Sequence, residues 1–256
     1  MTTSVTTDHF LDRSIAVKQI KGSGHRSGLD AIMLAATLPG DLHGQVADLG
    51  AGAGVVGMAV AHRCPASQVD LFEIDAGLVE LSNQSLKLDQ NSHLLERVKS
   101  HCTDVTLADQ PLLSVARKPG TYSAIVCNPP YNDAGHQASP DESRALAHVA
   151  APTTADVWVK TAAQMAAHKA CLALIVRPAN LTEYLSSIQR SFGNVILKPL
   201  HAKHDEPATR LLIGSRKGGK AALKMLPPLV LHQSDGAFSQ EAEEILRGRS
   251  AIDLFA

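Results

Sequence analysis

Short runs of apolar residues alternate along this chain with longer segments whose apolar residues recur every three or four positions. The short runs are typical of strands buried on both faces, and the longer segments are typical of helices with one apolar face. The predicted strands are 45–49, 69–74, 95–103, 123–127, 171–176, 194–200 and 208–215. The predicted helices are 29–38, 55–62, 76–90, 154–168 and 180–191. This alternation indicates an α/β fold with a mostly parallel sheet between two layers of helices.

Three parts of the chain lie outside this alternation: its two ends and one internal polar stretch. Residues 10–21 alternate weakly between apolar and polar and predict a strand or hairpin. A polar stretch from 132 to about 152 follows the fourth predicted strand and predicts a loop. We divide the chain into an N-terminal lead, residues 1–27, a main domain, residues 28–225, and a C-terminal extension, residues 226–256.

Composition places the chain among ordinary globular proteins. Hydrophobic residues make up 45% of its 256 residues and charged residues 19%, which argues against wholesale disorder. Lys plus Arg is 24 and Asp plus Glu is 25, so the formal net charge is −1. A strongly polybasic binding protein is therefore excluded, and any contact with nucleic acid has to come from a local patch.

Targeting and metal signals are weak. The first ten residues contain neither a basic nor an apolar segment, and the longest apolar runs fall far short of the roughly 18–20 residues that a membrane span needs. The four cysteines form no C-x-x-C pair, and the twelve histidines are scattered. We expect a cytoplasmic protein with no membrane partner and no metal. The sequence predicts no oligomeric state.

A glycine-rich turn follows the first strand of the alternating region and opens the next helix. Gly50, Gly52 and Gly54 permit a tight turn and let a ligand approach the backbone, while the helix N-terminus offers unpaired N–H groups. Glu73 ends the next strand, where a carboxylate can accept hydrogen bonds from ribose hydroxyls. The two features predict an adenosine-containing cofactor and leave NAD, FAD and S-adenosylmethionine open.

The residue order within this turn separates the three cofactors. Asp48 stands just before Gly50, whereas dinucleotide folds usually lack an acidic residue there. The string D-L-G-A-G-A-G resembles motif I of class I S-adenosylmethionine-dependent methyltransferases. The resemblance implies a Rossmann-like seven-stranded sheet with helices on both faces, S-adenosylmethionine as cofactor, and Asp48 near the amino-acid end of that cofactor. It also implies an acidic residue that meets the adenine amino group after the third strand, a position that Asp104 occupies.

The tetrapeptide Asn128-Pro129-Pro130-Tyr131 directly follows the fourth strand, at the sheet edge where α/β proteins bind ligands. An exocyclic amine conjugated with a purine is a poor nucleophile because its lone pair is delocalised. The Asn128 side-chain carbonyl and the Pro129 backbone carbonyl can each accept one N–H of such an amine and favour the charge that develops during attack on a methyl sulfonium. The prolines keep these acceptors rigid, and Tyr131 can stack on a base. We predict that these four residues are catalytic.

Several acceptors share this motif: adenine in DNA or RNA, guanine N2 in ribosomal RNA, and glutamine in release factors. The additional domains or inserts of the DNA, guanine and glutamine enzymes are not visible in this chain. Over most of its length it resembles the bacterial tRNA1(Val) adenine-37 N6-methyltransferase family, which implies methyl transfer to the N6 amine of an adenine in RNA, with tRNA as the partner. Guanine N2, protein glutamine, a small-molecule amine and a non-catalytic nucleotide- or RNA-binding module stay open as alternatives.

A segment before the first helix of the main domain also carries this resemblance. Residues 24–31 look like the family's stretch G-x-R-x-x-x-D-A. The resemblance implies that Arg26 and Asp30 lie near the methionine moiety of the cofactor and the substrate entrance. Residues 144–148 resemble a short family segment after the active-site loop, whereas Asn132 departs from the Phe that the family often has.

A basic cluster between positions 190 and 224 gives a second argument for an RNA partner. Its basic residues are Arg190, Lys198, Lys203, Arg210, Arg216, Lys217, Lys220 and Lys224. Asp205 and Glu206 are the acidic residues in this stretch. If the cluster faces the tetrapeptide, it would grip an RNA backbone. Neutralising Arg216, Lys217 and Lys220 is then expected to weaken RNA binding and flatten its salt dependence.

Overall fold

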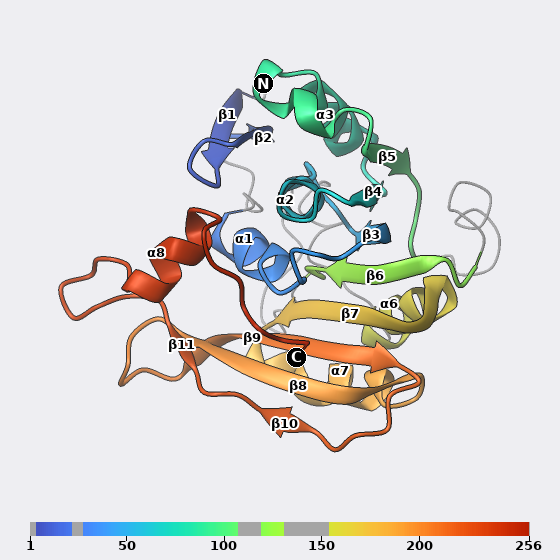
Figure 1. The fold of residues 1–256 in the computed structure, drawn as a ribbon, viewed down its shortest axis with the longest axis vertical. Coiled ribbons are helices and arrows are strands. Elements are labelled where there is room, and N and C mark those ends of the chain that lie inside the picture. The colour runs from blue at the N-terminus through green and yellow to red at the C-terminus, as the bar shows by residue number, and fades with distance from the viewer. Residues whose placement is uncertain (1–3, 22–27, 107–118, 131–153, 256) are drawn as a thin grey trace, which may run out of the picture.

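One twisted sheet runs through the molecule and carries helices on both faces (Figure 1). The computed structural model describes residues 4–21, 28–106, 119–130 and 154–255. Its strands are β1 (Val5–Phe10), β2 (Ile15–Ile20), β3 (Gly44–Leu49), β4 (Ser67–Glu73), β5 (Val98–Cys102), β6 (Tyr122–Cys127), β7 (Ala166–Val176), β8 (Phe192–His201), β9 (Ala208–Lys217), β10 (Lys224–Met225) and β11 (Leu229–Val230). Its helices are α1 (Leu29–Ala35), α2 (Val55–Arg63), α3 (Ala76–Leu86), α6 (Thr154–Met165), α7 (Leu181–Ile188) and α8 (Gln240–Leu246), with short 3₁₀ turns η1 (Asp89–Leu94) and η2 (Pro178–Asn180).

The main sheet has the order β10-β8-β9-β7-β6-β3-β4-β5, and β11 also pairs with β8. Neighbouring strands are parallel except at β9, which runs antiparallel to both β7 and β8 among the strands that the structure describes. The predicted α/β class and the mostly parallel sheet are therefore confirmed. The seven predicted strands are present, and the two-residue strands β10 and β11 extend the sheet along β8.

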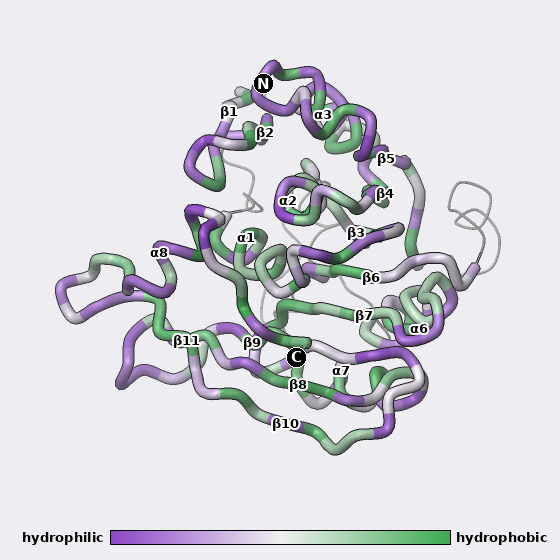
Figure 2. Tube along the Cα trace, viewed as in Figure 1, coloured by the Kyte–Doolittle hydropathy of each residue, from purple (hydrophilic) through white to green (hydrophobic). Residues whose placement is uncertain are grey.

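The hydrophobic core is divided by the sheet into two clusters. Along β7, Ala173 and Ile175 face the cluster that contains α1, α2 and α8, whereas Leu172 and Leu174 face the cluster that contains α6 and α7. The hydropathy of β7 is high along its carboxyl half, which lies at the centre of the sheet (Figure 2). Burial of both faces explains why these strands are continuous apolar runs in the sequence.

The hairpin β1–β2 lies apart from the main sheet and is held against α3 and η1 by side chains. Asn91 is fully buried, accepts a hydrogen bond from the Ala16 N–H (3.1 Å) and donates to the Ala16 carbonyl (2.6 Å). Ser85 of α3 accepts from the Lys18 N–H at 2.9 Å. These side chains therefore provide β2 with the pairing that a neighbouring strand would otherwise supply. The predicted N-terminal hairpin is confirmed and begins five residues earlier than expected.

The segment after β11 is fastened to the main core at several points. The N–H of Ile252 donates to the Ala36 carbonyl after α1 (2.8 Å), and Arg63 at the end of α2 donates to the Ser250 carbonyl (2.7 Å). Leu254 packs so closely on Gly214 of β9 that a Cβ there would lie 2.7 Å from its Cγ. Residues 226–255 thus share the hydrophobic core formed by α1, α2 and the sheet.

Candidate active site

The carboxyl ends of β3, β4, β5 and β6 meet at one edge of the sheet. Leu49, the last residue of β3, is level with Phe72 of β4 and with Cys127 of β6. Glu73 is level with Cys102, the last residue of β5. The segments that follow these strands therefore all begin at the same edge of the sheet, the edge at which a ligand site is predicted from the sequence.

Backbone hydrogen bonds join these strand ends. The glycine turn is fastened to β4, because the Ala51 N–H donates to the Phe72 carbonyl at 3.0 Å and the Gly52 N–H donates to Glu73 Oε2 at 2.8 Å. Glu73 Oε1 accepts from the backbone N–H groups of Ile74 and Asp75 at 2.9 and 3.0 Å. The Thr103 N–H donates to the Glu73 carbonyl at 2.8 Å. Glu73 therefore fixes the glycine turn and the start of the segment after β5 relative to one another.

The three motif glycines have different surroundings. All have positive φ, +67° at Gly50, +58° at Gly52 and +89° at Gly54, a conformation that non-glycine residues rarely adopt. A Cβ at Gly50 would lie 2.5 Å from Trp158, and one at Gly54 would lie 2.9 Å from Leu71. A Cβ at Gly52 would meet no atom within 4 Å. Gly52 thus leaves an open backbone surface at the N-terminus of α2, where no side chain caps the helix.

This surface fits the adenosine half of S-adenosylmethionine. The open side of Gly52 permits close approach of a ligand, and the Glu73 carboxylate bound to the same residue can accept further hydrogen bonds from hydroxyl groups. Asp104 lies two residues beyond β5 on the same edge, and its Oδ1 accepts from the N–H and the hydroxyl of Thr106 at 2.8 and 2.6 Å. The residues present therefore suit an adenosine-containing ligand.

Asp48 is a buried acid beneath the glycine turn. Its side chain is 1% exposed, and Oδ2 accepts from the Gly57 N–H in the first turn of α2 at 2.8 Å. Burial raises its pKa to about 7, the hydrogen bond from Gly57 opposes the rise, and the negative charge of Glu73 adds to it. The carboxyl group consequently changes charge near neutral pH, and a nearby cation would favour its ionised form.

Replacing Asp48 with asparagine is expected to remove a pH dependence of stability. Because the folded-state pKa is raised from 3.8 to about 7, the folded protein holds a proton between these values that the unfolded chain releases. The free energy of unfolding of the wild type therefore falls as pH rises from 4 to 7 and then levels off. Without ligand, D48N should gain little at pH 4 and about 4 kcal/mol relative to wild type at pH 8. Urea unfolding at both pH values measures this, and equal pH profiles for the two proteins would contradict it.

The first three residues of the tetrapeptide, Asn128, Pro129 and Pro130, begin beside the glycine turn. Asn128 directly follows Cys127 of β6, and Cys127 is level with Leu49, the residue before Gly50. Asn128 is half-buried and Pro129 is buried. The described residues bring together Asp48, Gly50, Gly52, Gly54, Glu73, Asp104, Asn128, Pro129 and Pro130. Arg26, Tyr131 and residues 144–148 lie outside the described residues.

Asp30 lies on the same edge of the sheet but farther along it. It is in the first turn of α1, and its Oδ2 accepts a hydrogen bond from Nε of Arg210 at 2.7 Å. Arg210 stands at the start of β9, next to Leu211, which is level with the last residue of β7. The side chain of Asp30 therefore contacts the β9 side of the edge, beyond β7, in the described part of the chain.

The basic cluster does not face the tetrapeptide as one patch in the described part of the chain, so the condition for an RNA grip by the whole cluster is not met. Because β9 is antiparallel to β7, Arg210 lies at the carboxyl edge, while Arg216 is level with Cys171 in the middle of β7, about 20 Å from Arg210 along the strand. Arg216 donates to the Phe255 carbonyl at 2.8 Å, and Lys217 donates to the Ala163 and Ala166 carbonyls at the end of α6. These side chains support the fold, so neutralising them does not test RNA binding.

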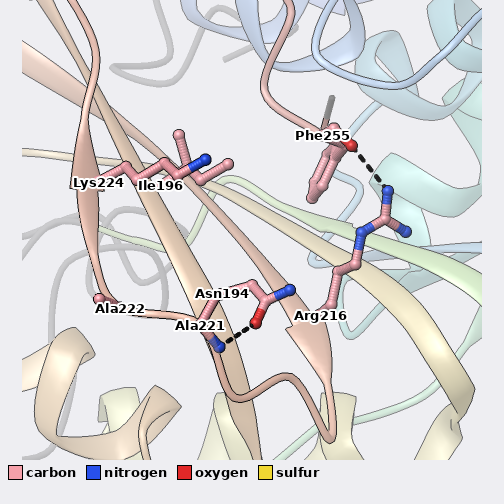
Figure 3. Close-up of a pocket in the computed structure, with 7 residues that line it drawn as sticks. All are labelled: Asn194, Ile196, Arg216, Ala221, Ala222, Lys224 and Phe255. Carbon is pink, nitrogen blue, oxygen red and sulfur yellow. Dashed lines mark hydrogen bonds between the residues drawn. The ribbon is translucent and has the colours of Figure 1, made fainter.

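A shallow pocket lies at this opposite end of β9 (Figure 3). Asn194, Ile196, Lys224 and Phe255 line it together with Arg216. The Arg216 guanidinium turns toward Phe255, over whose ring it lies at 5.5 Å (Figure 3). The pocket is thus remote from the glycine turn and the tetrapeptide.

Two residues of the site are absent from the sequence-based prediction. Ile74 follows Glu73 and is 49% exposed, so it leaves an apolar surface next to Glu73. Trp158 of α6 lies against Gly50. Two features of the sequence could have pointed to these residues: Ile74 is an apolar residue just after the acid that ends a strand, and Trp158 is the single tryptophan of the chain.

Comparison with known proteins identifies the class. The family model described as "Methyltransferase small domain" matches residues 26–197, and the chain belongs to this family. It is a methyltransferase that uses S-adenosylmethionine as the methyl donor. Within the described residues, no helix is both long and apolar enough to span a membrane.

Several methyltransferases resemble this chain at low identity, two of them over most of its length. The tRNA1(Val) (adenine(37)-N6)-methyltransferase of Vibrio parahaemolyticus is 26% identical over 233 residues, 89% of this chain and 91% of that enzyme. The enzyme of the same name from Yersinia enterocolitica is 27% identical over 84% of this chain and 81% of its own length. The ribosomal RNA small subunit methyltransferase C of Escherichia coli is 30% identical over 52% of this chain and 35% of its own length.

Solved structures share the fold. A crystal structure of a predicted O-methyltransferase from Agrobacterium tumefaciens has a TM-score of 0.76 and 28% identity, and the match covers 89% of this chain and all of that one. A 16S rRNA N2 methyltransferase of T. thermophilus, in complex with AdoMet and guanosine, has a TM-score of 0.57 and 17% identity over 84% of this chain and 50% of that one. The class I methyltransferase fold expected from the sequence is confirmed.

Proposed function

We propose that this protein transfers the methyl group of S-adenosylmethionine to the exocyclic N6 amine of an adenine in RNA, with tRNA as the substrate. The observation that carries the proposal is the position of Asn128 and Pro129. They follow β6 at the level of the glycine turn, on the edge that collects the strand ends. An amine held by these acceptors would lie next to a donor bound at Gly52.

The proposed donor site lies mainly at the ends of three strands, β3, β4 and β5. In the proposal, Gly50, Gly52 and Gly54 form the turn against which the donor lies, and Glu73 accepts hydrogen bonds from its ribose. Asp104 accepts from the adenine amino group. Asp48, with Arg26 and Asp30, serves the methionine end, whose ammonium would favour the ionised form of the buried Asp48 carboxyl. Ile74 packs against the adenine plane.

The acceptor site needs hydrogen-bond acceptors rather than a strong base. Bound S-adenosylmethionine supplies an electrophilic methyl group. The Asn128 side-chain oxygen and the Pro129 carbonyl each accept one N–H of the amine and stabilise the positive charge that forms on its nitrogen. Pro129 and Pro130 restrict the backbone and so lower the cost of reorganisation. Tyr131 stacks on the base, and the proton leaves to solvent after transfer.

The choice of adenine in tRNA rests on the two full-length relatives of that name. Guanine N2 is the second candidate, because the ribosomal RNA enzyme of Escherichia coli is 30% identical over half of this chain. Both candidates use the same planar-amine chemistry and differ in the purine that is bound.

The proposal is tested by methyl transfer from tritiated S-adenosylmethionine into total tRNA, ribosomal RNA and total protein, each fraction counted separately. Nucleosides from the labelled fraction are then resolved, and N128A serves as the inactive control. Label in N6-methyladenosine from tRNA, lost in N128A, is the expected result.

Label in methylguanosine or in protein would keep the chemistry and overturn the substrate. Binding of S-adenosylhomocysteine with no label in any fraction would overturn the RNA assignment. Binding of NAD and not of S-adenosylhomocysteine would overturn the reaction class.

A further inference from the structure

We infer that Trp158 is a positioning residue of the methyl-transfer site, which holds the glycine turn at a fixed position relative to the catalytic tetrapeptide. The inference deepens the proposed function and rests on its assignment of the donor to the glycine turn. Trp158 stands in the second turn of α6, and only 8% of its surface is exposed. It contacts neither reacting group in the proposed mechanism, so its effect passes through the backbone of Gly50.

The contact between the ring and the turn is close. A Cβ built on Gly50 would lie 2.5 Å from Cη2 and 2.9 Å from Cζ3 of Trp158, so the six-membered edge of the indole packs directly on the glycine Cα. Gly50 follows Leu49 and Asn128 follows Cys127, and Leu49 is level with Cys127. The ring therefore supports the turn at the point where the donor and acceptor sides of the site adjoin.

The same helix also holds the segment after β5. Thr161, three residues after Trp158 and on the same face of the helix, donates its hydroxyl proton to the Val105 carbonyl at 2.7 Å and is fully buried. Val105 follows Asp104, the proposed adenine ligand. One face of α6 thus carries two contacts, one with the turn after β3 and one with the segment after β5.

The outer end of α6 is anchored in turn on α7. Asp156 accepts from the Ser187 hydroxyl and forms an ion pair with Arg190 at 3.1 Å. This anchoring fixes the helix that carries the indole. Gly50 has no side chain, so the position of its backbone depends on the ring that packs against it. A displacement of about 1 Å at a reacting centre can cost a hundredfold in rate.

The test compares Trp158→Ala and Trp158→Phe with Met165→Ala. Met165 lies on the same helix in the same core cluster and is also buried, but it stands seven residues, about two helical turns, after Trp158. We expect W158A to raise the Kd for S-adenosylhomocysteine about tenfold and to lower kcat about a hundredfold. W158F should recover most of both, and M165A should lower the unfolding temperature while leaving Kd and kcat within about twofold of wild type.

A double mutant isolates the contact. Gly50→Ala alone places a methyl group against the ring and should raise the Kd for S-adenosylhomocysteine, whereas the same change in a Trp158→Leu background should raise it several-fold less. Because Trp158 is the single tryptophan, its emission in the wild type should also change when S-adenosylhomocysteine binds.

Equal Kd and kcat losses in W158A and M165A, or equal effects of Gly50→Ala in the two backgrounds, would overturn the inference. The Kd measurements need no acceptor. Failure to methylate tRNA would therefore overturn the proposed substrate and leave the inference about Trp158 to be decided by the donor affinity.

Discussion

Replacing Asn128 with alanine is expected to lower kcat by roughly a thousandfold and to leave the affinity for S-adenosylhomocysteine within about twofold of wild type. Asn128 follows β6 at the level of the glycine turn, and in the proposed mechanism its side-chain oxygen accepts a hydrogen bond that becomes more favourable as charge develops on the amine. An interaction of this kind, made mainly in the transition state, contributes to kcat and little to ground-state binding. Single-turnover methyl transfer and calorimetric titration measure the two effects.

Asn128→Asp is the matched control for this change. The carboxylate keeps an oxygen in the acceptor position and adds a negative charge that attracts the developing cation, so N128D should retain more activity than N128A. Thermal unfolding of both variants shows whether the fold is preserved. Turnover of N128A at more than a tenth of the wild-type rate would remove the amine clamp from the mechanism.

Replacing Gly52 with valine is expected to raise the Kd for S-adenosylhomocysteine by at least about a hundredfold. A Cβ at Gly52 meets no protein atom within 4 Å, so the new side chain would fill the surface against which the donor lies in the proposal. The cost to the fold is modest, about 1–2 kcal/mol, because the residue has φ of +58°. Calorimetric titration and thermal unfolding report the two quantities on the same samples.

Gly57→Ala is the matched control, because it is expected to lower stability more than affinity for S-adenosylhomocysteine. A Cβ at Gly57 would lie 2.1 Å from Leu71 Cδ2, so this variant should lose about 1–3 kcal/mol of stability by overpacking. At temperatures where it remains folded, its affinity should fall less than that of G52V. Wild-type affinity in G52V would show that the donor does not lie against the glycine turn.

The local motifs of the site could be predicted because each is carried by a few adjacent residues. The glycines of the turn, Glu73 at a strand end and Asn128-Pro129 after β6 occupy positions that the parallel-sheet rule brings to one edge. The register of β3 with β4 and β6 then sets their proximity. Their chemical roles stay predictions.

Contacts between distant segments could not be predicted in the same way. Arg210 and Asp30 are 180 positions apart, and no local pattern marks them as partners. Residues 210–217 are neighbours in sequence, yet they form one extended strand, so Arg210 and Lys217 lie toward opposite edges of the sheet. The charge count over 190–224 contains no information on where the strands run, so it could not show that Arg216 and Lys217 lie away from the tetrapeptide.

Packing and capping details also escape sequence reasoning. His101 stacks on Phe72 with ring centroids 5.1 Å apart, and its Nε2 lies 2.9 Å from the buried Asp70 carboxylate. No helix was predicted at Gln240–Leu246, although the Ser239 hydroxyl accepts from the Ala242 N–H at 3.1 Å as an N-cap. Seven residues are too few for a clear periodic signal.

The contact between the β1–β2 turn and the segment after α8 joins two parts of the chain that are synthesised far apart in time. Asp12 accepts a hydrogen bond from Arg249, 237 positions later, and Leu11 of the same turn lies against Gly248. At a translation rate of roughly 5–20 residues per second, the hairpin is synthesised on the order of 10–50 s before its partner leaves the ribosome. During this interval Leu11 lacks its contact with Gly248, so the packing of the hairpin is completed only after the C-terminal segment has been synthesised.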